Sequence, residues 1–332
     1  MAALSDIFLE ILAPILLMVL LGAVMRWKFK IDVGTLSKLN LYVFVPAFIF
    51  DRVSNSALAW SAMGGIAAMT VLQVMTLALI VGAIGRLFRM SRKTLAAVAM
   101  AVLFYNSGNY GLPLAELAYE NRGAEVQAFV LMSQNILTFT VGLGIAAWAH
   151  HGATAAGLIK VLQMPTLPTL AAALLARWYL NGHPEHHLPV AVSQTASFLS
   201  NGLVPVALIT LGAQLASNPR WPRWGPVGLV MFLRLIVGPI QMAGLLFGLH
   251  WLAGRYGGAF APLDLWPWPA ELLILTAAVP TAVNTLLLTL ELEGDADLAA
   301  DCVFWTTVGS CLTIAIWLVA IRWFFANVAN VA

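Results

Sequence analysis

The stretch Met69–Gly85 reads MTVLQVMTLALIVGAIG and decides the fold class, because it carries no charge over nearly the length of a membrane span. Its apolar residues run continuously, whereas a soluble helix confines them to a stripe. Of the 332 residues of the chain, 61% are hydrophobic and 10% are charged, while soluble domains carry roughly 25% charged residues. The sequence therefore predicts an all-α integral membrane protein.

Similar apolar segments follow one another along the chain, with short polar turns between them. At roughly 20 residues per span, the length allows about ten spans and leaves no room for a soluble domain. We expect spans near residues 4–25, 36–51, 62–85, 94–118, 124–148, 158–180, 188–215, 226–252, 268–290 and 299–324.

The Lys and Arg residues are distributed unequally between the turns. Two clusters lie at 26–38 and 86–93, after the first and third predicted spans. Because cytoplasmic loops carry the excess of Lys and Arg, these turns are expected inside a cell inner membrane, with both termini outside, in the periplasm. The net charge of +2 is too small to indicate a nucleic-acid partner, so the partners expected are the lipid bilayer and a small molecule.

The two halves of the chain resemble each other at an offset of five spans. Val45-Pro46-Ala47 in the second span matches Val204-Pro205-Val206 in the seventh, and Asn40 and Asn201 precede these prolines. In the fifth and tenth spans, Val130, Ser133 and Thr140 align with Val303, Thr306 and Thr313. Because five is odd, the second copy must enter the bilayer from the opposite side. We expect two inverted five-helix repeats, 1–150 and 151–332, an architecture typical of transporters.

Proline, glycine and asparagine interrupt the fourth and ninth spans. Residues 106–113 read NSGNYGLP, and residues 278–284 read AVPTAVN. Proline removes a backbone donor and glycine permits unusual backbone angles, so both helices should be broken in mid-membrane. Pro113 and Pro280 alone would be compatible with simple kinks. The paired, repeat-related breaks instead indicate a transport site at which the two spans cross.

Each second half-helix would direct the positive end of its dipole toward the crossing, which favours an anion. Asn109 and Asn284 offer amide donors there. A polar row on spans five and ten either completes the lining or forms ordinary interhelical hydrogen bonds; it comprises Ser133, Gln134, Thr138, Thr306, Thr307 and Ser310.

Arg234 is the most deeply placed charge, about eight residues inside the eighth span. Burying it is costly unless it finds a partner. It is expected either to attract a substrate carboxylate, or to extend to the cytoplasmic interface or pair with a carboxylate such as Asp301.

The segments NSGNYGLP (106–113), AAVPTAVN (277–284) and GDAD (294–297) resemble the auxin efflux carrier family, which includes bacterial malonate and malate permeases and the plant auxin exporters. The resemblance implies ten spans in inverted repeats, crossing broken helices and elevator-like alternation between a scaffold and a transport domain. It also implies small organic anions as substrates. Plant members carry a proline between the two asparagines, whereas this chain has Ser107-Gly108, which argues against auxin itself.

Together these patterns predict a secondary carrier of a small organic anion such as a mono- or dicarboxylate. The candidate substrate-binding residues are Asn40, Asn106, Asn109, Tyr110, Pro113, Ser133, Gln134, Asn201, Pro280, Thr281, Asn284 and Thr306, with Arg234 as a candidate charge partner.

Two other classes of function remain as alternatives, an ion channel and a membrane-embedded enzyme. No HExxH pattern or intramembrane Asp pair is seen, so an enzyme is not expected. His183, His186 and His187 cluster in one short turn without further ligands nearby, and a solvated loop explains them better than a metal site. No cofactor is expected. The coupling ion, sodium or proton, and the oligomeric state, including a homodimer, stay open.

Overall fold

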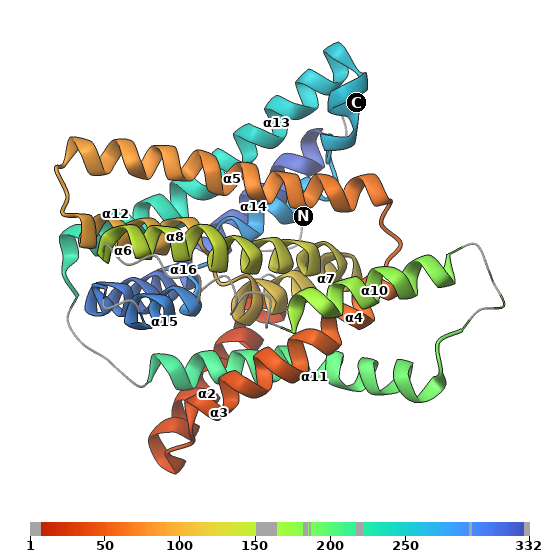
Figure 1. Cartoon of the computed structure of the whole chain (residues 1–332), viewed down its shortest axis with the longest axis horizontal. Coiled ribbons are helices and arrows are strands. Elements are labelled where there is room, and N and C mark those ends of the chain that lie inside the picture. Colours follow the sequence, from red (N-terminus) through yellow and green to blue (C-terminus); the bar gives the residue numbers. More distant parts are fainter. Residues whose placement is uncertain are drawn as a thin grey trace.

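The computed structural model describes residues 8–150, 165–181, 185, 187–216, 222–291 and 294–328. Within these ranges the chain is helical apart from its turns, and the only β-structure is an isolated bridge between Tyr105 and Thr281. The all-α prediction is confirmed (Figure 1).

The first half of the chain contains five predicted spans, and helices cover each of them. In chain order these are η1 (Phe8–Leu12), α2 (Ala13–Phe29), α3 (Val33–Leu39), η2 (Asn40–Phe44), α4 (Val45–Ser54), α5 (Trp60–Leu87), α6 (Arg92–Leu103), η3 (Ser107–Gly111), α7 (Leu112–Leu137), η4 (Thr138–Gly142) and α8 (Leu143–His150).

The second half follows a similar pattern. Its elements are α10 (Thr166–Leu180), α11 (Val190–Leu215), α12 (Trp224–Phe232), η5 (Leu233–Val237), α13 (Gly238–Tyr256), the 3₁₀-helix η6 (Gly258–Leu263), α14 (Ala270–Thr276), α15 (Val283–Glu291) and α16 (Ala296–Val328). The start of the predicted sixth span, at 158–164, lies outside the described residues.

Seven helical segments of the described chain are long and apolar enough to cross a membrane: Leu9–Phe29, Val33–Ser54, Trp60–Leu87, Ser107–Ala149, Val190–Leu215, Trp224–Tyr256 and Ala296–Asn327. The segment Ser107–Ala149 is 43 residues long and is kinked at Glu120, where φ is 54°. The chain is therefore a multi-pass membrane protein, as its sequence predicts.

Local sequence determines where several helices begin. Asp32 caps α3 by accepting hydrogen bonds from the backbone N–H groups of Gly34 and Thr35, and Ser91 caps α6 by accepting one from Thr94. Proline stands in the first turn of α2, α4, α7 and α13, each of which directly follows a short π-helical segment that interrupts the regular hydrogen-bond pattern.

The helices gather in two groups. Helices α2, α4, α10 and α11, with α3 and η2, pack chiefly against one another; we call these the four-helix group. Helices α5–α8 and α12–α16 form the crossing group. In Figure 1 the four-helix group occupies the lower part of the molecule and the crossing group the upper part.

Glycines allow α2 and α11 to approach closely within the four-helix group. A Cβ built on Gly212 would lie 1.8 Å from the carbonyl oxygen of Val19, and one on Gly22 would lie 2.1 Å from that of Ile209. No side chain fits in either gap. Small residues at such contacts are typical of membrane helices, whose association depends on close packing.

Large apolar side chains point outward from both groups. Leu79 of α5, Phe198 of α11 and Leu312 of α16 are 74%, 77% and 69% exposed. An apolar surface of this kind is costly in water and is favourable against lipid.

Candidate functional site

The first helix break separates α6 from η3 and α7. Asn106 begins the second part: its side-chain oxygen accepts a hydrogen bond from the N–H of Asn109, and its carbonyl oxygen accepts one from Gly111 at 2.8 Å. The Gln127 amide donates to the Ser107 carbonyl at 2.8 Å and so holds the irregular backbone from the side. The predicted break in the fourth span is confirmed.

The second break separates α14 from α15, and it lies directly against the first. The Asn106 N–H donates to the Pro280 carbonyl at 2.8 Å, and the Ala282 N–H donates to the Phe104 carbonyl at 3.0 Å. These bonds form the antiparallel bridge between Tyr105 and Thr281. The two broken helices therefore satisfy each other's backbone groups, which lipid could not do.

The two broken spans thus meet as predicted, although the point of contact differs from the expected one. It lies at 104–106, several residues before Pro113, which instead occupies the first turn of α7. Thr281 strengthens the contact. Its hydroxyl donates to the Ala101 carbonyl at 2.8 Å, and its N–H donates to the Thr306 hydroxyl at 3.1 Å.

Arg234 has a different role from either expectation. Its side chain is fully buried, so it does not extend to the interface. Its guanidinium donates to the carbonyls of Val102, at 2.6 Å, and Ala277, and lies 4.8 Å from the Tyr105 ring centroid. These carbonyls belong to the C-terminal ends of α6 and α14, where the helix dipoles are negative. Arg234 therefore neutralises the ends of both first half-helices.

A cavity of about 580 Å³ lies beside the crossing, within the usual size range of small-molecule sites. It is lined from both groups: by α3, η2 and α11 on one side, and by both helix breaks, α7 and α16 on the other. The N-terminal residues of both second half-helices line it, namely Ser107, Gly108 and Asn109 of η3 and Val283 and Asn284 of α15.

Two buried polar groups of cavity-lining residues have no hydrogen-bond partner among the described residues. These are the amide nitrogen of Asn106 and the side-chain oxygen of Asn40. Asn106 is 5% exposed and Asn40 is 4% exposed. A buried polar group without a partner costs about 1 to 3 kcal/mol, so these two groups favour a polar ligand beside them.

The charges around the cavity favour an anion. Lys38 is the only charged side chain among the described residues that line it. Two helix N-termini also line the cavity, that of η3, which continues into α7, and that of α15. Their positive dipole ends add to the positive potential of Lys38.

The structure brings five of the candidate residues to the cavity wall: Asn40, Asn106, Asn109, Gln134 and Asn284. Thr138 of the polar row also lines it. The amide nitrogen of Asn40 donates to the side-chain oxygen of Asn109 at 2.6 Å, which joins the two helix groups. The other predicted residues do not line the cavity; these are Tyr110, Pro113, Ser133, Asn201, Pro280, Thr281, Thr306 and Arg234.

Most of the polar row on spans five and ten forms bonds within its own helix. Ser133, Thr138, Thr306, Thr307 and Ser310 each donate to a carbonyl three or four residues earlier. Asn201 is exposed, which separates it from its proposed repeat equivalent Asn40, 4% exposed.

Sequence reasoning did not single out four polar residues that line the cavity: Ser37, Lys38, Asn135 and Gln214. The sequence indicates Lys38 only as one of the charges that set the topology. Asn135 directly follows Gln134 and could have been found from it, while Gln214 is near the end of α11 and carries no local signal.

His183 and His186 lie outside the described residues, so the histidine cluster is not placed by the structure. Cys302 and Cys311 lie on the same helix, α16, and both are free.

Comparison with known proteins shows that the chain is similar to transporters. Residues 166–318 match the model of a family described as membrane transport protein. The resemblance to a transporter family is confirmed. An uncharacterized transporter of Methanothermobacter thermautotrophicus is 26% identical and aligns over 94% of this chain and 98% of its own. A transporter-family relative from Rhizobium meliloti, named "Putative malonate transporter", is 25% identical over 87% of both chains.

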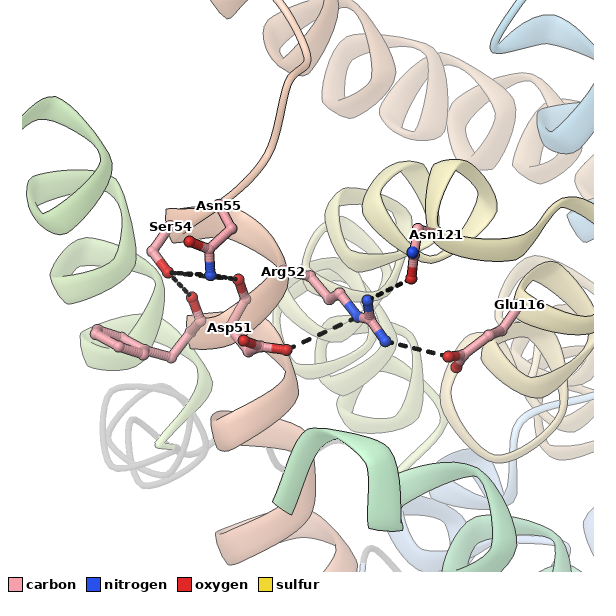
Figure 2. A network of polar contacts seen from close by, with 7 residues as sticks. Asp51, Arg52, Ser54, Asn55, Glu116 and Asn121 are labelled. Carbon is pink, nitrogen blue, oxygen red and sulfur yellow. Dashed lines mark hydrogen bonds and ion pairs between the residues drawn. The ribbon is translucent and has the colours of Figure 1, made fainter. Parts of the chain in front are cut away.

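A polar network joins the two groups of this transporter-like chain at the opposite end of span two from Lys38 (Figure 2). Arg52 of α4 donates to Glu116 of α7 at 3.1 Å and to Asn121 at 2.7 Å. Nearby, Glu125 of α7 accepts bonds from the hydroxyl of Ser56 and the N–H of Ala57. We call these contacts the α4–α7 network.

Proposed function

We propose that this chain is a secondary active carrier of a small organic anion, such as a mono- or dicarboxylate, that binds in the cavity beside the crossing. The observation that carries the proposal is the cavity wall. Two half-helix N-termini and one lysine line the cavity, and its lining residues Asn40 and Asn106 each carry an unpartnered buried amide atom. Each donor that meets a carboxylate would form a charge-assisted hydrogen bond of about 1.5 to 3 kcal/mol.

A carrier fits the cavity better than an enzyme does. Among the described residues, no Asp, Glu, His or Cys side chain lines the wall, and those are the groups that catalysis within a membrane usually requires. Neutral oxygens of the wall, such as those of Asn40 and Gln134, would also be suitable ligands for sodium, so coupling to sodium is one alternative that transport assays should include.

We also propose about ten spans in two inverted repeats, 1–150 and 151–332. Three additions to the seven long helices support this count: α6 joined to the first part of α7 up to the Glu120 kink, α10, and α14 joined to α15. The grouping of the helices also supports it. The first two spans of each half form the four-helix group, and the last three form the crossing group.

Transport would then proceed by alternating access, with the crossing group moving like an elevator against the four-helix group. The cavity wall includes exposed Lys38, so its mouth lies at that end of span two. The α4–α7 network lies at the other end, about 21 Å away along the helix. With the basic clusters in the cytoplasm of a cell inner membrane and both termini outside, this is an inward-facing arrangement.

A binding measurement tests the proposed site directly. We expect malonate, malate or a short monocarboxylate to raise the melting temperature of the purified protein, with or without sodium, because a ligand of the native state stabilises it by mass action. Asn109→Ala and Asn284→Ala should weaken that shift. Asn201→Ala is the control, because Asn201 is exposed and does not line the cavity. Equal shifts in all three variants would remove the cavity from the proposal.

A further inference from the structure

One lysine gives the cavity its only fixed positive charge among the described lining residues. Lys38 is in the last turn of α3, and no described carboxylate forms an ion pair with it. An unpaired cation at the mouth of a site built otherwise from neutral groups distinguishes ligands by their charge.

The nearest acidic residue along the chain, Asp32, is engaged elsewhere. Its carboxylate accepts hydrogen bonds from the Thr35 hydroxyl at 2.6 Å and from the N–H groups of Thr35 and Gly34. The bond from the Thr35 side chain is the largest cause of the lowered pKa of Asp32. Asp32 therefore serves as the cap of α3; its attraction for Lys38 is the smallest of the causes that lower its pKa, and the two form no ion pair.

Lys38 and the inner donors of the cavity line the same space. Residues two apart on a helix do not share a face, but Lys38 and Asn40 both line this cavity of about 580 Å³. Asn40 donates to Asn109 at the crossing. A ligand that meets Asn109 and the half-helix N-termini with one end therefore has its other end directed toward the mouth, where Lys38 lies.

We propose that Lys38 is a specificity-determining residue that binds the second carboxylate of a dicarboxylate and so selects dianions over monoanions. The proposal rests on the proposed function. The inner carboxylate meets neutral donors, which serve mono- and dicarboxylates alike. The outer one would be costly to desolvate without a cation, and a lysine side chain supplies a flexible point charge for it.

The test compares two ligands that differ by one charge, malonate and monomethyl malonate, on four proteins: wild type, Lys38→Gln, Lys38→Arg and Lys28→Gln. Lys28 is exposed on α2 and does not line the cavity, so it controls for the loss of one positive charge. Dissociation constants are measured at low salt, because added salt screens an exposed charge.

We expect Lys38→Gln to weaken malonate binding by up to about fivefold and to change monomethyl malonate binding less than about twofold. Lys38→Arg should retain most of the affinity for malonate, and Lys28→Gln should behave as wild type. Equal losses for both ligands, or no loss for either, would overturn the role of Lys38 alone. Failure of the wild-type protein to bind either ligand would overturn the proposed function, and the role of Lys38 with it.

Discussion

Replacement of Arg234 tests whether this buried charge holds the crossing together. Its guanidinium bonds the carbonyls of Val102 and Ala277, which terminate the two first half-helices. Hydrogen bonds to charged groups contribute about 1.5 to 3 kcal/mol each, so Arg234→Met should cost about 3 to 6 kcal/mol. Arg234→Lys keeps the positive charge, but a lysine ammonium cannot reach both carbonyls as the planar guanidinium does. This variant should therefore lose about half as much free energy of unfolding as Arg234→Met.

The assay is thermal unfolding of each variant in detergent, with Arg255→Lys as the control. Arg255 lies on the same helix, α13, but is exposed, so its replacement should leave the melting temperature unchanged. Ligand binding is measured on the variants that remain folded. A stable Arg234→Met protein that has lost only its affinity for anions would refute the structural role and restore Arg234 as a direct ligand of the substrate.

The remaining predictions concern the cavity, the α4–α7 network at the end of span two away from Lys38, and the packing of α2 against α11. Asn284→Asp should weaken anion binding more than Asn284→Ala, because a carboxylate in the cavity wall repels the ligand; the reverse order, measured as dissociation constants, would indicate a cationic substrate. Arg52→Gln and Glu116→Gln should each favour outward opening by about 1 kcal/mol, roughly fivefold, because either change breaks the ion pair of the α4–α7 network. The shift is measured by introducing a cysteine at a cavity-lining position and labelling it with a membrane-impermeant reagent added outside. If the effects of the two substitutions on the labelling rate add up in the double variant, the two side chains do not act as one ion pair, which would contradict the prediction. Gly212→Ala should lower the melting temperature, because its Cβ would overlap the Val19 carbonyl, whereas Gly64→Ala, with nothing within 4 Å, should not; equal melting temperatures would show that α2 and α11 can separate without cost.

The helical fold and the two breaks could be predicted from the sequence because their signals are local. Uncharged apolar runs such as Met69–Gly85 have few alternatives to a membrane span, and the NSGNYGLP segment cannot continue a regular helix. The structure adds that Asn106 caps the second part of the broken span.

The partners across the crossing could not be predicted, because they depend on tertiary contacts. Nothing near Arg234 in the sequence indicates the Val102 and Ala277 carbonyls, which are free only because two distant helices both end there. The alignment of the two halves also did not indicate which asparagine is buried beside the cavity. Asn40 and Asn201 occupy similar places in the two halves, yet only Asn40 lines the cavity.

Counterflow in proteoliposomes tests the central claim most directly. Vesicles loaded with unlabelled malonate and diluted into a trace of labelled malonate should accumulate label transiently, with an initial rate that saturates as the outside concentration rises. Asn109→Ala should abolish the accumulation, because the unlabelled and labelled anions share one site that alternates between the two sides. Uptake that rises linearly with concentration and shows no transient accumulation would contradict a carrier and indicate a channel.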